Sequence, residues 1–352
     1  MRYLIYGTGA VGGLLGGLLA LAGQPVTFLA RSALAGQLRS HGLQLSGDIA
    51  LRRLAQPVVE TTLGAAASHN RPDVVLLTVK AYDVELAARD LAASFENPPP
   101  VVSFLNGIGS EQLLGAALGA AQVIPATLTT AVQISPAGEV RVERSRGIGL
   151  AGANPLLPAL RTEFEAAGLP VRMYASAGRM KWSKLMTNLV ANSSSAILDW
   201  TAAQVYRHPG IARLEIQTLR EVLWAMNSLG LSPVNLPGVP VAVMGLGLHL
   251  PAPLIRPVLG RMVSRGRGRK MPSLHYDIGR GKSEAAWLHG PVIQADPDGG
   301  AHTPANALLL ELMQRLVQDG RAAEEFRDRP EHLIELAARR GVPGMSRYTG
   351  GT

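Results

Sequence analysis

Residues 3–12 read Tyr-Leu-Ile-Tyr-Gly-Thr-Gly-Ala-Val-Gly, at the start of a chain of 352 residues. Residues 3–6 are typical of a buried β-strand, and the apolar run from Val11 to Ala22 indicates a helix. Glycines in a G-x-G-x-x-G spacing stand between them. In this context they permit a tight turn, the approach of backbone amides to a pyrophosphate, and close packing of helix on strand. The predicted cofactor contacts in this stretch are Gly7, Thr8, Gly9, Ala10, Val11 and Gly12. The alternative is a glycine-rich helix start used only for packing.

The first half of the chain alternates short apolar runs with helical patterns, which is typical of βαβ units and a parallel sheet. We expect strands at residues 3–6, 25–30, 74–79 and 101–105, and an extended region at 123–142 that turns at Pro136-Ala137-Gly138. Beyond about Lys181 the periods become long and helical, notably over 210–230 and 304–318. The sequence therefore predicts an α/β, Rossmann-type domain over residues 1–175, a mainly α-helical domain over 176–345 and a flexible tail over 346–352.

The end of the second predicted strand bears on the choice of dinucleotide. An acidic residue about 20 positions beyond the glycine motif would bind the ribose hydroxyls of NAD, whereas an arginine would pair with the 2′-phosphate of NADP. The strand ends in Arg31-Ser32, without an acidic residue nearby. Arg31 therefore favours NADPH, although an arginine-rich chain can also place an ordinary surface arginine at this position.

Two other predicted strands end in polar residues. Lys80 follows one strand, and Asn106-Gly107 follows another. Ligands bind beyond the carboxyl ends of strands in open α/β sheets, so both positions are candidates for cofactor contacts. Each is also compatible with an ordinary solvated loop.

The net charge of +8 is concentrated in one segment. Between Arg256 and Lys282 stand eight cations against Asp277 alone, a net of +7 that leaves about +1 for the rest. Global basicity is thereby excluded. The cluster from Arg265 to Lys270 has no interleaved aromatics, which disfavours a nucleic-acid partner. We expect this charge to attract an anionic cofactor and a carboxylate substrate.

The composition restricts the compartment and the chemistry. The absence of cysteine removes disulfides, thiolate nucleophiles and cysteine-ligated metals. No apolar run is long and unbroken enough to indicate a membrane span or a targeting segment. The eight histidines are scattered without the spacing of a metal site, so we expect no metal. A cytoplasmic protein is the expectation.

Polar residues recur at helical spacing where the second domain begins. Lys184, Asn188 and Asn192 are separated by four residues each, and a helix would carry them as one polar stripe in an apolar sequence. A cation that donates a proton, beside two amides that orient a polar substrate, suits the reduction of a ketone. The alternative is a surface helix with its polar side in water. Lys181 would share a face with Asn188, so spacing does not choose between the two lysines.

The chain resembles the ketopantoate reductase (2-dehydropantoate 2-reductase) family over almost its whole length. The resemblance is carried by the N-terminal glycine motif and by an ordered set of short motifs. These are Thr78-Val79-Lys80-Ala81, Asn106-Gly107-Ile108-Gly109, Trp182-Ser183-Lys184-Leu185 with Asn188 and Asn192, Pro272-Ser273-Leu274, Gly281-Lys282-Ser283-Glu284 and Thr303-Pro304-Ala305-Asn306. It implies a Rossmann domain followed by a helical domain of the 6-phosphogluconate dehydrogenase type.

The resemblance implies a role for each matching residue. Lys184 would be the general acid, Asn188 and Asn192 would contact the substrate, Ser273 would hydrogen-bond it, and Glu284 would lie at the cofactor and catalytic centre. Lys80 and Asn106 would hold the cofactor. The implied reaction is hydride transfer from NADPH to the C2 ketone of 2-dehydropantoate, which gives (R)-pantoate for pantothenate and coenzyme A synthesis.

The chain departs from the family after Glu284. The family continues with an apolar residue, an acid, an aromatic and Asn-Gly, whereas this chain reads Ala-Ala-Trp-Leu-His-Gly over residues 285–290. The missing acid and His289 leave room for another branched 2-oxo acid. A non-catalytic NADP-binding regulator is the alternative from a different class. A homodimer is common for such folds, but the sequence itself does not give the oligomeric state.

Overall fold

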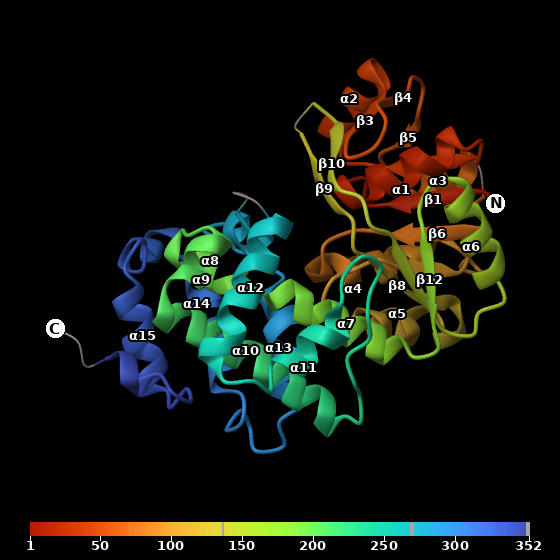
Figure 1. Cartoon of the computed structure of the whole chain (residues 1–352). Coiled ribbons are helices and arrows are strands. Elements are labelled where there is room, and N and C mark those ends of the chain that lie inside the picture. Colours follow the sequence, from red (N-terminus) through yellow and green to blue (C-terminus); the bar gives the residue numbers. More distant parts are fainter. Residues whose placement is uncertain (70, 136, 268–270, 350–352) are drawn as a thin grey trace. The chain divides into compact units, whose positions relative to one another are not determined.

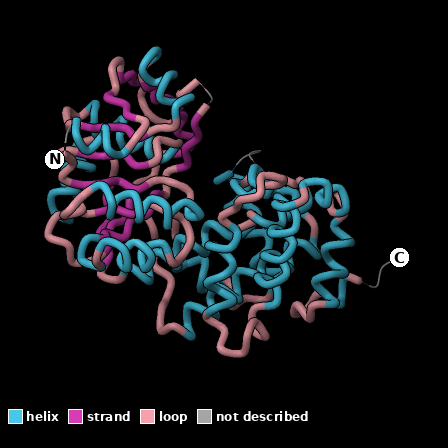
Figure 2. The backbone as a smooth tube through the Cα atoms, turned by 180° about the vertical axis from the view of Figure 1, so that it is seen from behind, coloured by secondary structure: helices cyan, strands magenta, loops and turns pink. Residues whose placement is uncertain are grey.

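The computed structural model describes residues 1–69, 71–135, 137–267 and 271–349 (Figure 1). The chain divides into two compact units. The first unit comprises residues 1–105, 109–181 and 236–239, and the second unit comprises residues 106–108, 182–235 and 240–352. Figure 2 shows strands gathered in the first unit and helices throughout the second.

The first unit is built on an eight-stranded sheet with the order β12-β11-β8-β7-β6-β1-β2-β5. The strands from β8 to β5 are parallel, whereas β11 runs antiparallel to β8. Numbered along the chain, the parallel strands follow the order 3-2-1-4-5-6 of dinucleotide-binding α/β domains. The bounds are β1 (Tyr3–Tyr6), β2 (Val26–Leu29), β5 (Val58–Glu60), β6 (Val74–Leu77), β7 (Val101–Ser103), β8 (Val123–Leu128), β11 (Ile148–Ala151) and β12 (Val171–Tyr174).

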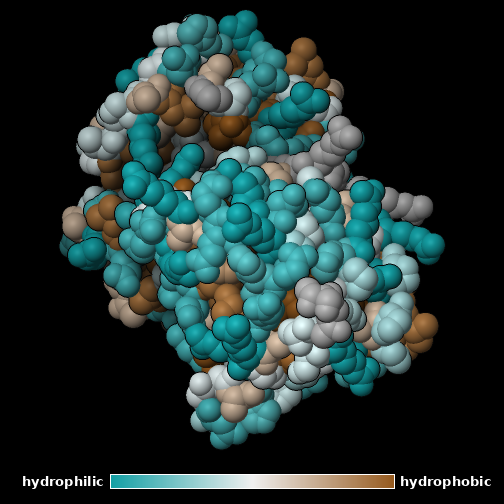
Figure 3. Space-filling model, turned by 90° about the vertical axis from the view of Figure 1, so that its left-hand side faces the viewer, coloured by the Kyte–Doolittle hydropathy of each residue, from teal (hydrophilic) through white to brown (hydrophobic). Residues whose placement is uncertain are grey.

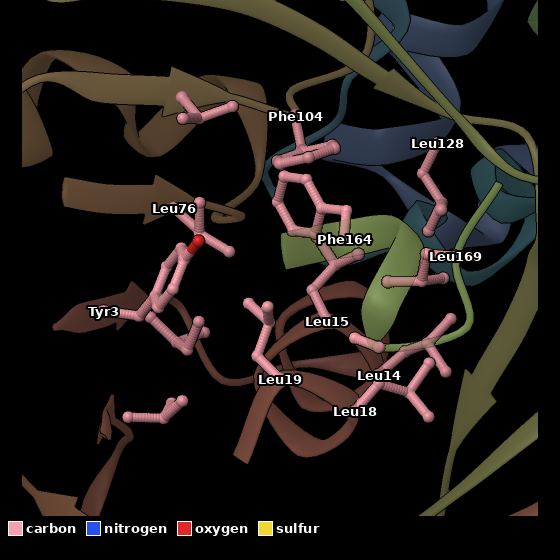
Figure 4. Close-up of a cluster of buried hydrophobic side chains, with 14 of the residues drawn as sticks. Tyr3, Leu14, Leu15, Leu18, Leu19, Leu76, Phe104, Leu128, Phe164 and Leu169 are labelled. Atoms are coloured by element: carbon pink, nitrogen blue, oxygen red, sulfur yellow. The ribbon is translucent and has the colours of Figure 1, made fainter. Parts of the chain in front are cut away.

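The core of the first unit lies between this sheet and its helices (Figure 4). β2 and β6 are buried along their whole length because helices cover both faces of a parallel sheet. The rings of Phe104 and Phe164 meet edge to face, with centroids 6.2 Å apart. The Tyr3 hydroxyl donates to the Glu163 carboxylate over 2.7 Å and ties β1 to α6 (Leu157–Ala166).

Helix α1 (Ala10–Leu21) packs between two sheets, which explains its glycines. A Cβ at Gly16 would lie 2.5 Å from the Phe28 ring of the large sheet, and a Cβ at Gly13 would lie 2.8 Å from Val140 of a smaller sheet. Glycine therefore lets both sheets approach the helix axis. The smaller sheet has the order β4-β3-β10-β9, with bounds β3 (Leu43–Gly47), β4 (Arg52–Leu54), β9 (Ala131–Ile134) and β10 (Glu139–Arg144).

Short helices complete the first unit. They are α2 (Ser32–His41), α3 (Leu63–His69), α4 (Val84–Ser94) and α5 (Ser110–Leu118), with the 3₁₀ turns η1 (Ala81–Asp83) and η2 (Ala120–Gln122). Helix α7 (Ala177–Leu189) begins in the first unit and continues in the second from Trp182.

The second unit packs its helices around α10 (Pro209–Ser228), which is buried on most of its faces. Ile211, Leu214, Leu219 and Val222 lie fully inside and supply much of the apolar contact. The other elements are α8 (Ser193–Leu198), α9 (Ala202–Arg207), α11 (Val241–Gly247), α12 (Ala252–Arg267), α13 (Ala285–Gln294), α14 (Pro304–Gln318) and α15 (Pro330–Arg339), with the 3₁₀ turns η3 (Ser273–Asp277), η4 (Gly320–Glu325) and η5 (Ser346–Tyr348).

The predicted fold class is confirmed: an α/β unit with a mostly parallel sheet is followed by a helical one. The strand at residues 3–6 and the helix at 304–318 match the structure residue for residue. The extended region at 123–142 divides into β8, β9 and β10. Pro136 of the predicted turn, Arg269 and Lys270 of the basic segment, and residues 350–352 of the expected tail lie outside the described residues.

Among the described helices, none is both long and apolar enough to cross a membrane. The face drawn in Figure 3 is mostly hydrophilic, with hydrophobic residues in small groups.

Candidate active site

The glycine loop, residues 7–12, leaves the carboxyl end of β1 and is tied to both neighbouring strands. The Thr78 hydroxyl donates to the Gly7 carbonyl over 2.7 Å at the end of β6. The amide and hydroxyl of Thr8 both donate to the Leu29 carbonyl at the end of β2. Gly7 has φ +104°, which only glycine adopts without strain. The loop therefore lies at the point where the strand order reverses, the usual ligand position in such sheets.

The geometry of this loop fits a phosphate ligand. Gly9 is the N-cap of α1, and the first helical bond runs from the Gly13 amide to the Gly9 carbonyl over 2.8 Å. The three amides before Gly13 therefore have no acceptor within the helix. A Cβ at Gly9 would meet no atom within 4 Å, whereas a Cβ at Gly12 would lie 2.5 Å from the Gly7 carbonyl oxygen. Gly12 is needed for packing, and Gly9 keeps open space in front of the free amides.

Arg31 and Lys80 flank the glycine loop at the ends of β2 and β6. The Arg31 side chain is 92% exposed, and its guanidinium lies 3.5 Å from the Asp83 carboxylate. The Asp83 amide donates to the Lys80 carbonyl over 2.9 Å, so one short turn connects the two cations. The structure brings Arg31 and Lys80 to the same edge of the sheet as the glycine loop.

The two lysines of α7 have different surroundings. Lys181 is buried in the first unit, where its ammonium pairs with the Glu111 carboxylate over 2.7 Å and donates to the Leu105 carbonyl over 2.6 Å. The Ser103 hydroxyl also donates to Glu111. Lys184 belongs to the second unit and is half-buried, one helical turn before Asn188. Spacing alone did not choose between the two lysines as the candidate proton donor. The structure distinguishes them, since Lys181 is in a buried ion pair and Lys184 is partly accessible.

Three asparagines of the second unit form a connected chain of hydrogen bonds, which we call the asparagine chain. The Asn188 amide donates to the Asn106 side-chain oxygen over 3.1 Å, and the Asn192 amide donates to the Asn188 carbonyl over 2.9 Å. The Asn192 side-chain oxygen accepts from the Leu274 amide over 3.3 Å. Residues that were predicted separately as cofactor and substrate contacts therefore meet in one place.

The expectation of one polar stripe along a single helix is wrong at its last residue. Helix α7 ends at Leu189, and Asn192 is the N-cap of α8. The break is at Ala191, which has φ +44° and whose amide donates to the buried Glu215 carboxylate over 2.7 Å. A partner from α10 thus interrupts the helix and sets the position of Asn192.

Ser273 and Glu284 lie on the elements next to the asparagine chain. Ser273 is exposed at the start of η3, directly before Leu274, whereas Glu284 is buried as the N-cap of α13. One turn further on, the Trp287 carbonyl accepts from the Ile108 amide over 3.2 Å. A Cβ at Gly107 would lie 2.4 Å from the Trp287 carbonyl oxygen, so glycine is required there.

A second polar group in this unit has no counterpart in the predicted site. We call Ser193, His289, Asn306 and Glu221 the closed cluster, because each is at most 1% exposed. The Asn306 amide donates to the Glu221 carboxylate over 2.8 Å and to the Thr218 carbonyl over 3.1 Å, so its side-chain oxygen accepts from Nδ1 of His289 over 2.8 Å. Nε2 of His289 then accepts from the Ser193 hydroxyl over 2.6 Å.

Burial changes the acidity of two members of the closed cluster. Desolvation lowers the pKa of His289 from 6.5 to about 4, against the opposing hydrogen bond to Asn306. Desolvation raises the pKa of Glu221 from 4.5 to about 7, although the amides of Asn306 and Ala305 act in the opposite direction. Both ring nitrogens of His289 are bonded within the cluster, so this side chain has no atom left for a substrate.

A histidine and two carboxylates also meet on the loop after α13. Asp296 is buried and accepts from the amides of His302 over 2.7 Å and Asp298 over 3.1 Å. The ring of His302 stacks on Trp224, with centroids 4.8 Å apart. The carboxylate is held by amides of its own loop, so we assign this group to loop structure.

Comparison with known families decides the relationship. The N-terminal model of the family described as ketopantoate reductase PanE/ApbA matches residues 3–153, and the C-terminal model of the same family matches residues 177–317. The chain belongs to the ketopantoate reductase family. Members of the family are nicotinamide-dependent oxidoreductases that act on small 2-oxo acids.

Individual relatives of the ketopantoate reductase family agree with this placement. The 2-dehydropantoate 2-reductase of Halobacterium salinarum is 26% identical over 91% of this chain and 100% of its own length. That of Archaeoglobus fulgidus is 27% identical over 89% of this chain and 97% of its own.

Solved structures show the shared fold. A ketopantoate reductase structure from Ralstonia eutropha has a TM-score of 0.76 at 24% identity, and covers 91% of this chain and 99% of its own. A D-mandelate dehydrogenase solved with NADH and anilino(oxo)acetate has a TM-score of 0.74 at 18% identity, with the same coverage. The fold is therefore common to reductases that are named for different acids.

Sequence reasoning missed two acidic partners of α7 and of the segment after it. Glu111 and Glu215 are far from α7 in sequence, and no spacing rule connects them with Lys181 or Ala191. The Thr-Pro-Ala-Asn motif at 303–306 was a signal for the closed cluster, because Asn306 is its centre.

Proposed function

We propose that this protein reduces the C2 ketone of 2-dehydropantoate to (R)-pantoate with NADPH, the reaction that supplies pantothenate and coenzyme A synthesis. The observation that carries the proposal is the asparagine chain beside Lys184. The side-chain amides of Asn188 and Asn192 each donate one hydrogen within the asparagine chain. Among the described residues, the second hydrogen of each amide has no acceptor. These donors suit the oxygens of a 2-oxo carboxylate.

Lys184 is the proposed proton donor. Lys184 lies one turn before Asn188 on α7, and its ammonium would protonate the oxygen that becomes negative as the ketone is reduced. Lys181 is unsuited to this role because its ammonium is buried between Glu111 and the Leu105 carbonyl. Ser273 is exposed and is proposed to hydrogen-bond the substrate, and buried Glu284 is proposed to act at the cofactor and catalytic centre.

The glycine loop, Arg31, Lys80 and Asn106 are the proposed cofactor contacts. The nicotinamide cofactor, when bound, supplies the hydride. The amides that precede Gly13 would bind its pyrophosphate in the space that Gly9 keeps open. Arg31 is almost fully exposed and pairs only at 3.5 Å with Asp83, so it is available to a 2′-phosphate. This favours NADPH over NADH.

A relative that reduces another 2-oxo acid is the second candidate. It is favoured by the similarity in fold to a D-mandelate dehydrogenase and by the missing acid after Glu284. A non-catalytic NADP-binding regulator is less favoured, since Lys184, Asn188, Asn192, Ser273 and Glu284 are all present.

A panel of 2-oxo acids with small, branched and aromatic side chains tests the proposal. NADPH consumption is followed by absorbance, and kcat/KM is compared across the panel. We expect 2-dehydropantoate to give the highest value. A clear preference for an aromatic acid would select the second candidate. NADPH binding without turnover of any acid would select the regulator.

A further inference from the structure

A pocket of about 510 Å³ opens between α9 and α12 of the second unit. Arg207 ends α9, and Arg256 and Arg261 lie on α12. Tyr206 forms part of the wall. The volume is in the range that holds small-molecule ligands. The lining contains none of the residues proposed above for the cofactor or the substrate, so the inference is independent of the proposed function.

The arginines of this pocket are not neutralised by the protein. No acidic residue lines it, and across the described parts of the chain no carboxylate lies within 4 Å of Arg207, Arg256 or Arg261. Arg256 is half-buried in the second turn of α12, near the helix end whose dipole disfavours a cation. Arg207 and Arg261 are exposed, so the pocket presents three cations to solvent, which favours an anionic ligand.

The geometry of the wall keeps the pocket open. A Cβ at Gly260 would lie 3.4 Å from the Tyr206 Cβ, so α9 and α12 are already in van der Waals contact on one side. Tyr206 is only 4% exposed, so packing prevents its ring from turning into the pocket as an exposed side chain could. One side of the pocket is therefore formed by two packed helices and the buried Tyr206, and the pocket is open to solvent on the other side.

We propose that this pocket binds the phosphate group of a small phosphorylated molecule. A guanidinium is a planar fork that binds phosphate through two parallel hydrogen bonds. A phosphate monoester carries almost two charges and three terminal oxygens, which match three forks better than the single charge and two oxygens of a carboxylate. Two of the eight cations in the basic segment of the sequence thereby gain a function.

A lipid headgroup is a second source of phosphate. Leu254, Val258 and Met262 follow one another at four-residue spacing on α12 and are 60%, 46% and 36% exposed. Such a ridge would contact a bilayer if the pocket received a lipid. We favour the soluble ligand because all three arginines line one pocket, and the experiment separates the two sources.

Calorimetric titration of the full chain with inorganic pyrophosphate and with glycerol 3-phosphate tests the proposal. The variants are Arg256→Gln and Arg261→Gln, and Arg321→Gln on η4 is the matched exposed arginine. We expect saturable binding that weakens at least about tenfold in each pocket variant and is unchanged in Arg321→Gln. Gly9→Val reports on the glycine loop, the other phosphate site, and should retain this binding.

Four results would overturn the proposal. The first is absence of binding, and the second is equal affinity in the wild type and the pocket variants. The third is loss of binding in Gly9→Val alone, which would assign the phosphate to the glycine loop. The fourth is binding to phosphatidylglycerol vesicles without binding of either soluble phosphate, which would replace the small molecule by a membrane surface.

Discussion

The glycine loop of the first unit and the asparagine chain of the second, the two proposed binding sites, position their polar groups by opposite means. The loop uses backbone amides at the start of α1, and Gly9 contributes by having no side chain. The asparagine chain uses side chains from three separate segments, held by one another through amide hydrogen bonds. The first arrangement depends on a local conformation, and the second depends on the packing of the whole unit.

This difference predicts which substitutions affect ligand binding and which affect stability. A side chain added at Gly9 would enter open space, whereas a substitution at Asn192 would remove a hydrogen bond between two elements of the second unit. The closed cluster gives a third case, because its polar atoms are satisfied internally and have nothing to offer a ligand. A polar residue can therefore bind a ligand only if some of its donors or acceptors have no partner within the protein.

The largest effect is expected at the two lysines of α7. Lys184→Met should reduce kcat by about 10²- to 10⁴-fold, the contribution of a positioned general acid, and leave the thermal midpoint nearly unchanged. Lys181→Met should instead lower the free energy of unfolding by about 3 kcal/mol, because Glu111 loses its buried partner. Steady-state kinetics and thermal unfolding of both variants measure this. The assignment fails if Lys181→Met loses activity at full stability and Lys184→Met remains active.

The next effect distinguishes two glycines of one loop. Gly9→Val should weaken NADPH binding about 100-fold, since its side chain would occupy the space in front of the free amides, and should cost about 1 kcal/mol of stability or less. Gly12→Val should destabilise the fold by about 1–3 kcal/mol or more, because its Cβ would overlap the Gly7 carbonyl. Fluorescence titration and denaturant unfolding separate the two. Equal affinity in Gly9→Val and wild type would remove the phosphate from this loop.

The closed cluster predicts a dependence of stability on pH. Glu221 has its pKa raised from 4.5 to about 7 in the folded state, so its contribution is present below 4.5 and is lost as pH rises to about 7. His289 has its pKa lowered from 6.5 to about 4, so its contribution is present above 6.5 and is lost as pH falls to about 4. The two slopes oppose each other between pH 4.5 and 6.5.

Single substitutions should expose each slope. In His289→Asn the free energy of unfolding should fall as pH rises from 4.5 to 7, and in Glu221→Gln it should rise with pH from 4 to 6.5, each by up to about 3 kcal/mol. Urea unfolding at a series of pH values measures both. Parallel slopes in the two variants would contradict an origin of the pH dependence in these two side chains. The ranking of 2-oxo acids should be the same in His289→Asn and wild type.

The smallest effect is expected at Arg31. Arg31→Ala should weaken NADPH binding about tenfold and leave NADH unaffected, because only NADPH carries the 2′-phosphate. Asp83→Asn should strengthen NADPH binding slightly, since it releases the exposed Arg31 from a 3.5 Å ion pair that is worth less than about 1 kcal/mol. Inhibition constants of the oxidised cofactors provide the measurement. An equal loss of both cofactors in Arg31→Ala would exclude a contact with the 2′-phosphate.

Sequence predicted the parts of the molecule that local rules determine. The strand Tyr3–Tyr6 and the glycine turn follow from apolar runs and from conformations that only glycine adopts. The smaller sheet was not predicted around β4, since Arg52–Leu54 is three residues long and mostly exposed. The end of α7 depends on Glu215 from another helix. The prediction from periodicity therefore extended the helix beyond its true end and placed Asn192 within it.

The exchange of short segments between the units limits how this protein can be dissected. Residues 106–108 belong with the second unit and residues 236–239 with the first, where the Pro237 carbonyl accepts from the Thr129 hydroxyl over 2.8 Å. A single cut near residue 181 would leave each unit without one of its own short segments. Chimaeras with relatives should therefore exchange residues 106–108 together with the second unit and residues 236–239 together with the first. Neither fragment from a cut near residue 181 should fold fully unless the other fragment is present.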